Sequence, residues 1–428
     1  MAQEPSLPDV DASLLQAWRR EFHQFPETGW CEFRTSARLA ELLAPIARLT
    51  PGRDFLHRSF LYDRDVKVAV EQSRAAALGA DDKWLEWLGP LPGLIATIDS
   101  GEPGPTIALR VDIDALGLDE CGDSDHPPAR HGFQSCFPGV CHGCGHDGHM
   151  AIGLGVAHWL AANKSAWRGR FLLICQPAEE GCRGGRAIAE SGALDDVERL
   201  FGFHLGMGFG AGTLVTAAEQ FLSTTKFDVQ FKGLAAHASI APQLGRNALA
   251  AACQAVTQML AIPRHGDGIT RVNIGTLNAG SSRNIIPEQA LLRGEVRGAS
   301  DEVNQYLMAA VSRIVDGCAI SHEVRGKLTL AGESCTIRQS PALVALATAV
   351  GHESGLFSNL VGAAPFGASE DASWLMRRVQ EQGGDALYLV FGCAVRGGHH
   401  TSRFDFDEAV MATAVRYLCQ LLCRTSQY

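Results

Sequence analysis

Short, nearly continuous apolar runs recur along two stretches of the chain and alternate with helical patterns. Five such runs are LPGLIATIDS, TIALRVDID, RFLLICQP, RLFGFHLG and LYLVFGC. They are typical of parallel strands that helices bury on both faces. Apolar residues at helical spacing predict helices over 13–20, 35–43 and 151–162. The pattern therefore predicts an α/β domain built on a mostly parallel sheet.

Between residues 221 and 333 the pattern changes. TKFDVQFKG, TRVNIGTLNAG and ALLRGEVRG alternate apolar and polar positions with a period of two, and helical patterns cover 247–262 and 301–318. With the last strand, HEVRGKLTL, they predict β-α-β-β-α-β, the ferredoxin-like α+β order. We expect residues 221–333 to form a second domain, inserted into a first domain of residues 1–220 and 334–428. Its antiparallel sheet has edges that favour dimerisation.

Residues 55–88 are charged and rich in alanine, and DRDVKVAVEQSRAAALGADDKWLEWL has helical spacing. This predicts a helical segment inserted into the first domain. The chain length of 428 residues also exceeds what a single hydrophobic core usually supports, which favours two domains.

Charge and composition exclude several classes of partner. The formal net charge is −10, and no Lys/Arg cluster suits nucleic acid or an anionic membrane surface. No uncharged apolar run reaches the roughly 18 residues of a membrane span, and the N-terminus lacks the pattern of a signal peptide. The thirteen cysteines are an odd number scattered through apolar segments, as expected of free thiols. We therefore expect a cytoplasmic protein without a nucleic-acid or membrane partner.

The segment 141–149, CHGCGHDGH, holds two cysteines, three histidines and one aspartate. These are ligands of a borderline metal such as zinc or manganese. Cys144 and His146 are the strongest candidates, and Cys141, His142 and His149 are weaker. The two internal glycines favour a loop over a helix. A closed structural zinc site is the alternative, but it usually has two regularly spaced Cys/His pairs, and only half a site is present here.

Four of the apolar runs end at side chains that bind metals. TIALRVDID ends in Asp112 and Asp114, and RLFGFHLG ends near His204. RFLLICQP leads to the pair Glu179 and Glu180, and LYLVFGC leads to His399 and His400. The carboxyl ends of parallel strands meet at one edge of a sheet, where ligands bind. These side chains therefore predict the second half of the metal site.

Three of the carboxylates have specific expected roles. The adjacent pair Glu179 and Glu180 suggests that one binds metal while the other takes a proton from a metal-bound water; a solvated acidic turn is the alternative. Asp112 can orient a ligand imidazole, because metal-bound histidines commonly donate their other N–H to a carboxylate. A simple cap at the end of the strand is the alternative for Asp112.

The inserted domain carries three further polar candidates. His237 lies in the small-residue segment GLAAHASIAP, and SSRNIIP contains Arg283 and Asn284. A histidine suits an oxyanion, and a guanidinium with an amide suits a substrate carboxylate. Arg297 is a weaker candidate of the same kind, and ordinary surface roles are the alternative for all four.

Taken in order, HGCGHDGH, QPAEEG, the HLG strand end, GLAAHASIAP, SSRNIIPE and GHHTSRFDFDE resemble the metal-dependent aminoacylase/carboxypeptidase family over essentially the whole chain. The resemblance implies two divalent ions, Mn²⁺ or Zn²⁺, that activate water for cleavage of an amide bond. It implies five metal ligands, with Cys144 suited to bridging both ions: Cys144, His146, Glu180, His204 and His400. The choice of His400 over His399 rests on the family pattern HxxxF, completed here by Phe404.

The same resemblance assigns the remaining roles. Glu179 is then the general base, and His237 is a lid histidine that stabilises the oxyanion, including in the site of a partner protomer. Arg283 and Asn284 resemble contacts to the substrate carboxylate. The commoner family motif is MHACGHDGH, so Cys141 stands here for Met and Gly143 for Ala. This departure leaves open whether Cys141 contacts metal.

The resemblance is closest to a branch that cleaves p-aminobenzoyl-L-glutamate to p-aminobenzoate and glutamate. Alternatives are hydrolysis of another N-acyl or aromatic-acyl amino acid, and a non-catalytic partner subunit of such a hydrolase. We also expect a homodimer through the inserted lid domain, or assembly with a homologous second subunit.

Overall fold

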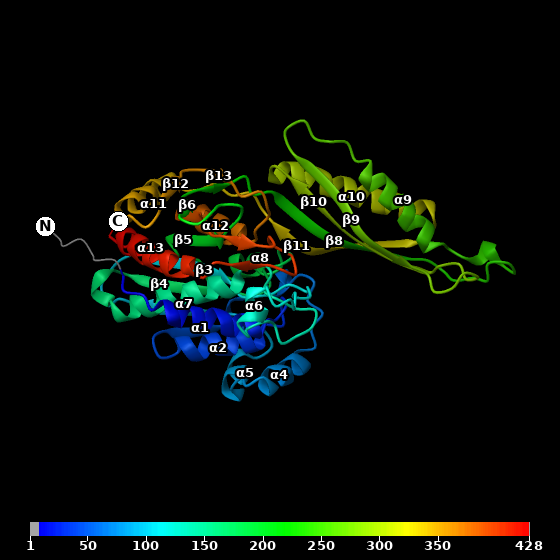
Figure 1. Cartoon of the computed structure of the whole chain (residues 1–428). Coiled ribbons are helices and arrows are strands. Elements are labelled where there is room, and N and C mark those ends of the chain that lie inside the picture. Colours follow the sequence, from blue (N-terminus) through cyan, green and yellow to red (C-terminus); the bar gives the residue numbers. More distant parts are fainter. Residues whose placement is uncertain (1–7, 428) are drawn as a thin grey trace.

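An eight-stranded mixed sheet forms the centre of the computed structural model, which describes residues 8–427 (Figure 1). The strand order is β1-β2-β4-β3-β5-β14-β6-β12, and the four strands β4, β3, β5 and β14 run parallel. The bounds are β1 Arg48–Pro51, β2 Leu94–Asp99, β3 Thr106–Asp112, β4 Arg170–Gln176, β5 Arg199–Leu205, β6 Thr213–Val215, β12 Asn359–Val361 and β14 Asp385–Phe391.

Helices cover both faces of this sheet, which explains why its strands are almost continuously apolar. Along β3, Ile107 and Leu109 enter one core and Ala108 enters the other. The first core includes residues of α1, α2, α7, α11 and α13, and the second includes α8 and α12. Their bounds are α1 Ala12–Gln24, α2 Phe33–Leu43, α7 His146–Ala162, α8 Gly185–Ala189, α11 Pro341–Ser354, α12 Ala372–Glu381 and α13 Ala409–Thr425.

One apolar run does not follow the predicted direction. The strand β2 pairs antiparallel with β4, so the expectation of a parallel strand was wrong for LPGLIATIDS. The reason is the short connection to β3, which consists of residues 100–105 only. A parallel crossover needs about a dozen residues or more, so β3 must start at the end of the sheet where β2 finishes.

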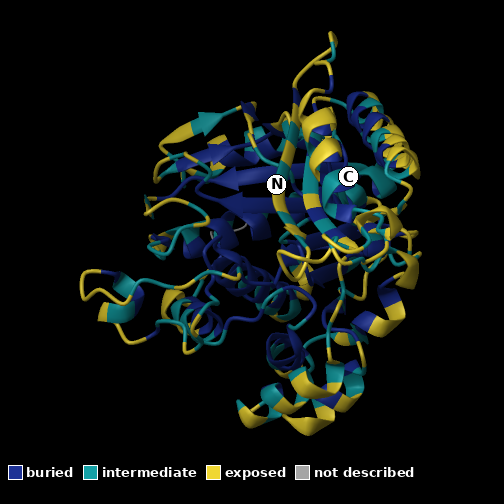
Figure 2. Cartoon of the chain, turned by 90° about the vertical axis from the view of Figure 1, so that its right-hand side faces the viewer, coloured by how far each residue is buried: buried dark blue, intermediate teal, exposed yellow. Residues whose placement is uncertain are grey.

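The segment predicted as a helical insert forms short helices: α3 Gly52–Phe55, the 3₁₀ turn η1 Arg58–Phe60, α4 Val68–Ala77 and α5 Asp82–Leu88. Of these, α4 and α5 pack on α2. Ala75, Leu85 and Leu88 pack with Phe33 and Ala37 in a small separate core. The outer faces of these helices are exposed at the bottom of Figure 2.

A second, four-stranded antiparallel sheet extends away from the large one (Figure 1). Its strand order is β11-β8-β10-β9, with two helices on one face, so the element order and pairing are those of a ferredoxin-like fold. On β8, Phe227, Val229 and Phe231 are buried against these helices. The bounds are β8 Ser223–Lys232, α9 Ala248–Leu260, β9 Thr270–Ala279, β10 Gln289–Gly298, α10 Asp301–Ser321 and β11 Arg325–Ser334.

The remaining elements are short and lie in connecting segments: α6 Pro127–Arg130, η2 Lys164–Ala166, β7 Ala218–Glu219, η3 Pro242–Leu244, β13 Ala364–Pro365, β15 Val395–Arg396 and β16 Asp405–Phe406. Within residues 8–427, no helix is both long enough and apolar enough to cross a membrane.

Candidate metal centre

The predicted metal-binding side chains gather at the carboxyl edge of the parallel strands. Cys144, Glu179, Glu180, His204 and His400 all line one cavity of about 340 Å³. His204 lies near the end of β5, and Glu179 and Glu180 follow β4. Because β4, β3 and β5 are parallel, their ends deliver these side chains to the same place.

The CHGCGHDGH segment is half loop and half helix. The expectation of a loop throughout was wrong, because α7 begins at His146 and includes the last four residues of the motif. The turn into the helix is made at Gly145, whose φ of 93° is a conformation that favours glycine. Gly148 inside the helix allows close packing, because a Cβ there would approach the Phe406 ring to 2.5 Å. This packing fixes the direction of His146.

Two groups of potential ligands share the Cys144 thiol. Cys144, His146 and His204 form one group, and Cys144, Glu180 and His400 form the other, with ligand atoms within 4.8 Å of one another in each. Cys144 Sγ lies 3.5 Å from His204 Nε2, and His400 Nε2 lies 3.3 Å from Glu180 Oε1. A thiolate common to two groups is the arrangement needed to bridge two ions.

Backbone carbonyls orient the two buried imidazoles. His146 Nδ1 donates to the Asp114 carbonyl and His204 Nδ1 donates to the Leu205 carbonyl, each at 2.9 Å. In the neutral form of each ring, Nε2 is then the nitrogen with the free lone pair, and His146 Nε2 has no hydrogen-bond partner among residues 8–427. Burial and neighbouring histidine rings lower the pKa of His204 well below its ordinary value, which favours the neutral ligand form. The donor set of thiolate, imidazole and carboxylate fits a borderline divalent ion.

Asp112 forms its histidine hydrogen bond with His149, which is not one of the five proposed ligands. Its Oδ1 accepts a hydrogen bond of 2.6 Å from His149 Nδ1, whereas the nearest ligand candidate atom, His146 Nε2, is 3.7 Å from its Oδ2. The other nitrogen of His149 accepts the Leu205 N–H at 3.2 Å. Both nitrogens of His149 are thus occupied, so this histidine braces α7 against β3 and β5.

The other weaker candidates lie outside the two ligand groups. Cys141 is buried in a bridge with Leu116, and burial raises the pKa of its thiol to about 12. Burial lowers the pKa of His142 to about 3. His399 lines the cavity, but its Nε2 is 3.2 Å from the Leu205 carbonyl. The geometry therefore favours His400 over His399.

Glu179 sits above a buried ionic cluster that the sequence did not reveal. Arg110 on β3 contacts Asp112 at 2.8 Å, Glu370 at 3.0 Å and Asp371 at 3.2 Å. Carboxylate oxygens of Glu179, Glu370 and Asp371 lie within 4.8 Å of one another. Burial, followed by the charges of Glu370 and Glu180, raises the pKa of Glu179 well above its ordinary value. A raised pKa suits a group that takes up and releases a proton.

Left-handed backbone recurs around the cavity. Ala178, immediately before Glu179, has a φ of 54°, and His400 has a φ of 61°. The Ala178 N–H donates to the buried Glu32 carboxylate at 2.7 Å, which ties the sharp turn to the start of α2. Such conformations persist only where surrounding contacts hold them, and they concentrate at functional sites.

The candidates from the second sheet divide into two places. Arg297 on β10 lines the metal cavity. His237, Arg283 and Asn284 are exposed and do not line it; they lie together, because His237 pairs with Ile285 in a β-bridge. Within one chain these three residues do not reach the cavity, so their predicted roles require a second chain and stay predictions. They occupy loops at the ends of β8 and β9, and nothing in a single sequence indicates which loops face which cavity.

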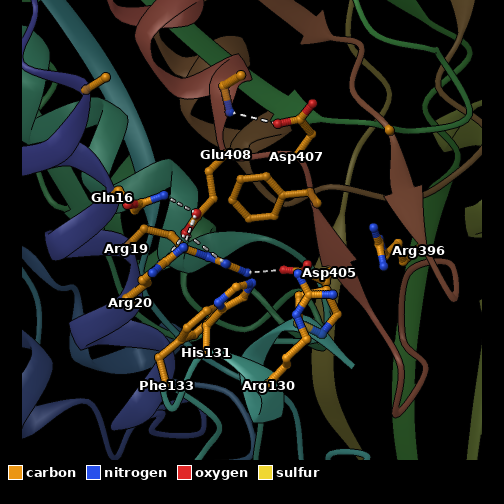
Figure 3. Close-up of a pocket in the computed structure, with 15 residues that line it drawn as sticks. Gln16, Arg19, Arg20, Arg130, His131, Phe133, Arg396, Asp405, Asp407 and Glu408 are labelled. Atoms are coloured by element: carbon orange, nitrogen blue, oxygen red, sulfur yellow. Dashed lines mark hydrogen bonds and ion pairs between the residues drawn. The ribbon is translucent and has the colours of Figure 1, made fainter. Parts of the chain in front are cut away.

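A second cavity, of about 530 Å³, lies between α1, α6 and the β15–β16 segment (Figure 3). In it the buried guanidinium of Arg19 contacts Asp405 at 2.7 Å and Glu408 at 3.2 Å. Arg19 also contacts Asp147, the second residue of α7, at 2.8 Å. This network fixes the first turn of α7, which carries His146.

Comparison with known proteins agrees with this geometry. Residues 108–424 match the family described as Peptidase family M20/M25/M40. One of the p-aminobenzoyl-glutamate hydrolase subunits of Escherichia coli is 43% identical over 96% of this chain and 95% of its own. The indole-3-acetyl-aspartic acid hydrolase of Enterobacter agglomerans is 44% identical, covering 94% of each chain.

A solved structure agrees as well. The aminobenzoyl-glutamate utilization protein from Klebsiella pneumoniae superposes with a TM-score of 0.83 at 38% identity, covering 96% of each chain. The chain described here therefore belongs to peptidase family M20/M25/M40, and it is a metal-dependent amidohydrolase.

Proposed function

We propose that this chain hydrolyses the amide bond of p-aminobenzoyl-L-glutamate, giving p-aminobenzoate and glutamate. The observation that carries the proposal is the Cys144 thiol shared by two ligand groups, with Glu179 beside them. Cys144, His146, Glu180, His204 and His400 would hold two divalent ions, Mn²⁺ or Zn²⁺. Such ions polarise an amide carbonyl and lower the pKa of water at neutral pH.

Glu179 is the proposed general base. Its carboxylate takes a proton from the attacking water and returns it to the nitrogen of the leaving amino acid. Burial and the nearby carboxylates raise the pKa of Glu179, which favours its uptake of the proton from water. The cluster below it, centred on Arg110, holds Glu370 and Asp371 in place at its side.

The substrate follows from the relatives and from the cavity. Glutamate and aspartate conjugates of aromatic acids are named for two relatives above 40% identity. Phe366 lines the cavity 5.9 Å from the His204 ring, centroid to centroid, and offers an aromatic face to an aromatic acyl group. Indole-3-acetyl-aspartate is the second candidate substrate, because the hydrolase named for it is similar over the same share of the chain.

The test is an assay of both conjugates with added Mn²⁺ or Zn²⁺, on the unaltered chain and on Glu179→Gln. We expect the variant to lose turnover while its metal content, measured by mass spectrometry, stays the same. Near-normal activity of Glu179→Gln would show that the base is another residue. A metal-loaded chain that is inert on every conjugate would instead support a non-catalytic subunit.

We propose that residues 221–333, which contain the second sheet, form a lid and dimerisation domain. β9 is an edge strand, and four apolar side chains at the tip near His237 are 40 to 79% exposed: Leu234, Ile240, Leu244 and Ile285. His237 Nδ1 accepts the N–H groups of Ser239 and Ile240, which leaves Nε2 available to a neighbour. We place the His237, Arg283 and Asn284 of one chain in the site of a second copy or of a homologous subunit.

Mixing two inactive variants tests this placement. Glu179→Gln lacks the base and His237→Ala lacks the lid imidazole, so a mixed dimer contains one complete site. We expect activity to return when the two are unfolded and refolded together. If light scattering confirms a dimer but activity does not return, His237 acts in the site of its own chain.

We also propose a cytoplasmic location, which the thirteen free cysteines support.

A further inference from the structure

Lys226 lies in the part of the metal-cavity wall that the second sheet forms. Lys226 on β8 and Arg297 on β10 both line this cavity, as do Glu179 and Glu370. Lys226 pairs in register with Glu295 of β10, so Lys226, Glu295 and Arg297 share one face of the sheet. The opposite face carries the apolar residues that pack on α9 and α10.

The two cations differ in whether they are already neutralised. Arg297 binds both carboxylate oxygens of Glu295, at 2.8 and 3.1 Å. Glu295 is the cross-strand neighbour of Lys226, yet its carboxylate goes to Arg297. The Lys226 ammonium makes no hydrogen bond or ion pair with any residue from 8 to 427. It is therefore the free positive charge of the cavity.

The position of the Lys226 ammonium is that of a binding group. Lys226 lines the cavity together with Glu179, Glu180, Gly181 and Cys182, so it borders the Glu179–Cys182 turn. Lys226 also lines an adjoining cleft of about 460 Å³ together with Glu180 and Gly181. It thus stands beside the reacting groups, where the cavity opens.

The proposed metal ions would offset the charge of the carboxylates that hold them, but they are reserved for the amide and the water. Glu370 also lines the cavity and is not one of the proposed ligands. A substrate side chain that carries its own carboxylate and lies away from the ions is therefore bound best where a separate cation meets it. Lysine is a compact charge on a flexible stem, suited to reaching a carboxylate on either a two- or three-carbon side chain.

We propose that Lys226 binds the side-chain carboxylate of the substrate's amino acid and so selects N-acyl derivatives of acidic amino acids. This rests on the proposed function, in which Arg283 and Asn284 of a partner chain take the α-carboxylate. Lys226 binds a group that does not react, so its contribution falls mainly on KM and little on kcat.

The experiment compares p-aminobenzoyl-glutamate with p-aminobenzoyl-glutamine, which differ only in the side-chain charge. Lys226→Met should lower kcat/KM on the glutamate conjugate about 10- to 100-fold, as expected for a hydrogen bond to a charged group. The glutamine conjugate should change less than about threefold, since no charge is lost there. Lys226→Arg should keep most of the preference. Lys232→Met, at the exposed far end of the same strand, is the matched control.

An equal loss on both conjugates would overturn the proposal, because it would assign Lys226 to the α-carboxylate or to the fold. Calorimetric binding of free L-glutamate and L-glutamine to the metal-loaded protein separates this inference from the proposed reaction. We expect L-glutamate to bind more tightly, and Lys226→Met to remove the difference. Equal binding of the two amino acids to the unaltered protein refutes the role of Lys226. Failure of the proposed function is instead recorded as no hydrolysis of either conjugate.

Discussion

Replacing Arg110 with methionine should destabilise the catalytic part of the protein in a pH-dependent way. Arg110 is fully buried and contacts three carboxylates, those of Asp112, Glu370 and Asp371. Removing one partner of a buried ion pair costs about 3 to 5 kcal/mol, because the remaining charges lie buried without compensation. For the catalytic part of the chain, with an unfolding entropy of about 2.1 cal/mol/K per residue, about 4 kcal/mol corresponds to a fall in Tm of about 6 °C.

The pH dependence follows from Asp371. Burial raises its pKa to about 7, although Arg110 opposes that rise, so loss of Arg110 should raise the pKa further. The folded state then holds a proton that the unfolded state, with an ordinary pKa near 4, releases. Folding stability therefore falls as pH rises from about 4 through the folded pKa. The Tm difference between the wild type and Arg110→Met should be larger at pH 8.5 than at pH 6.

Scanning calorimetry at the two pH values, with constant Mn²⁺, measures both effects. Arg378→Met is the control, since its ion pair with Asp195 is exposed and should be worth less than about 1 kcal/mol. The double variant Arg110→Met/Asp371→Asn should recover part of the loss at pH 8.5. A Tm difference that is the same at both pH values would refute the reasoning, because the cost would then come from packing and not from uncompensated charge.

Three further substitutions test the support of the metal centre. Cys144→Ser should lose both ions by mass spectrometry, since both ligand groups use this thiol, whereas Cys141→Ser should keep them. Arg19→Met should weaken metal binding about 10-fold in a competition titration, because it frees the first turn of α7; unchanged affinity, or an equal effect of Arg20→Met, would contradict this. Gly145→Ala should cost about 1 to 2 kcal/mol through its φ of 93°, visible as a lower Tm, while Gly143→Ala should be tolerated.

The parts of the site that the sequence predicted are those determined locally. Glu179, Glu180 and His204 follow apolar runs, and strand ends meet at one edge of a parallel sheet whatever the rest of the fold. Cys144 and His146 are two residues apart, so one turn brings both to the same cavity. By contrast, the direction of β2 depended on the length of its connection to β3, and the start of α7 depended on the left-handed turn at Gly145.

The ionic cluster under Glu179 was missed because its members are far apart in sequence. Arg110 and Asp371 are separated by 261 positions, and only the fold shows that they meet. One signal was present: Arg110 is a charged residue in the middle of the apolar run TIALRVDID, whose every position is buried in β3. A buried charge needs a partner, so this arginine alone implied unassigned carboxylates nearby. GASEDAS, with Glu370 and Asp371 among small residues, was the segment to inspect.

Polar residues of the second sheet lie in two different places, which the sequence alone could not show. Arg297 and Lys226 lie on the part of the sheet that reaches the cavity of their own chain, whereas His237 and Arg283 lie on loops that do not. A sequence identifies polar residues in loops but not the distance between a loop and a cavity in another part of the chain. If both proposals hold, the same sheet serves two sites. Lys226 selects the side chain of the substrate in its own chain, and His237 completes the site of the partner chain. The pairing of Lys226→Met with the mixed-dimer assay separates these two roles, because the first acts within a chain and the second requires two.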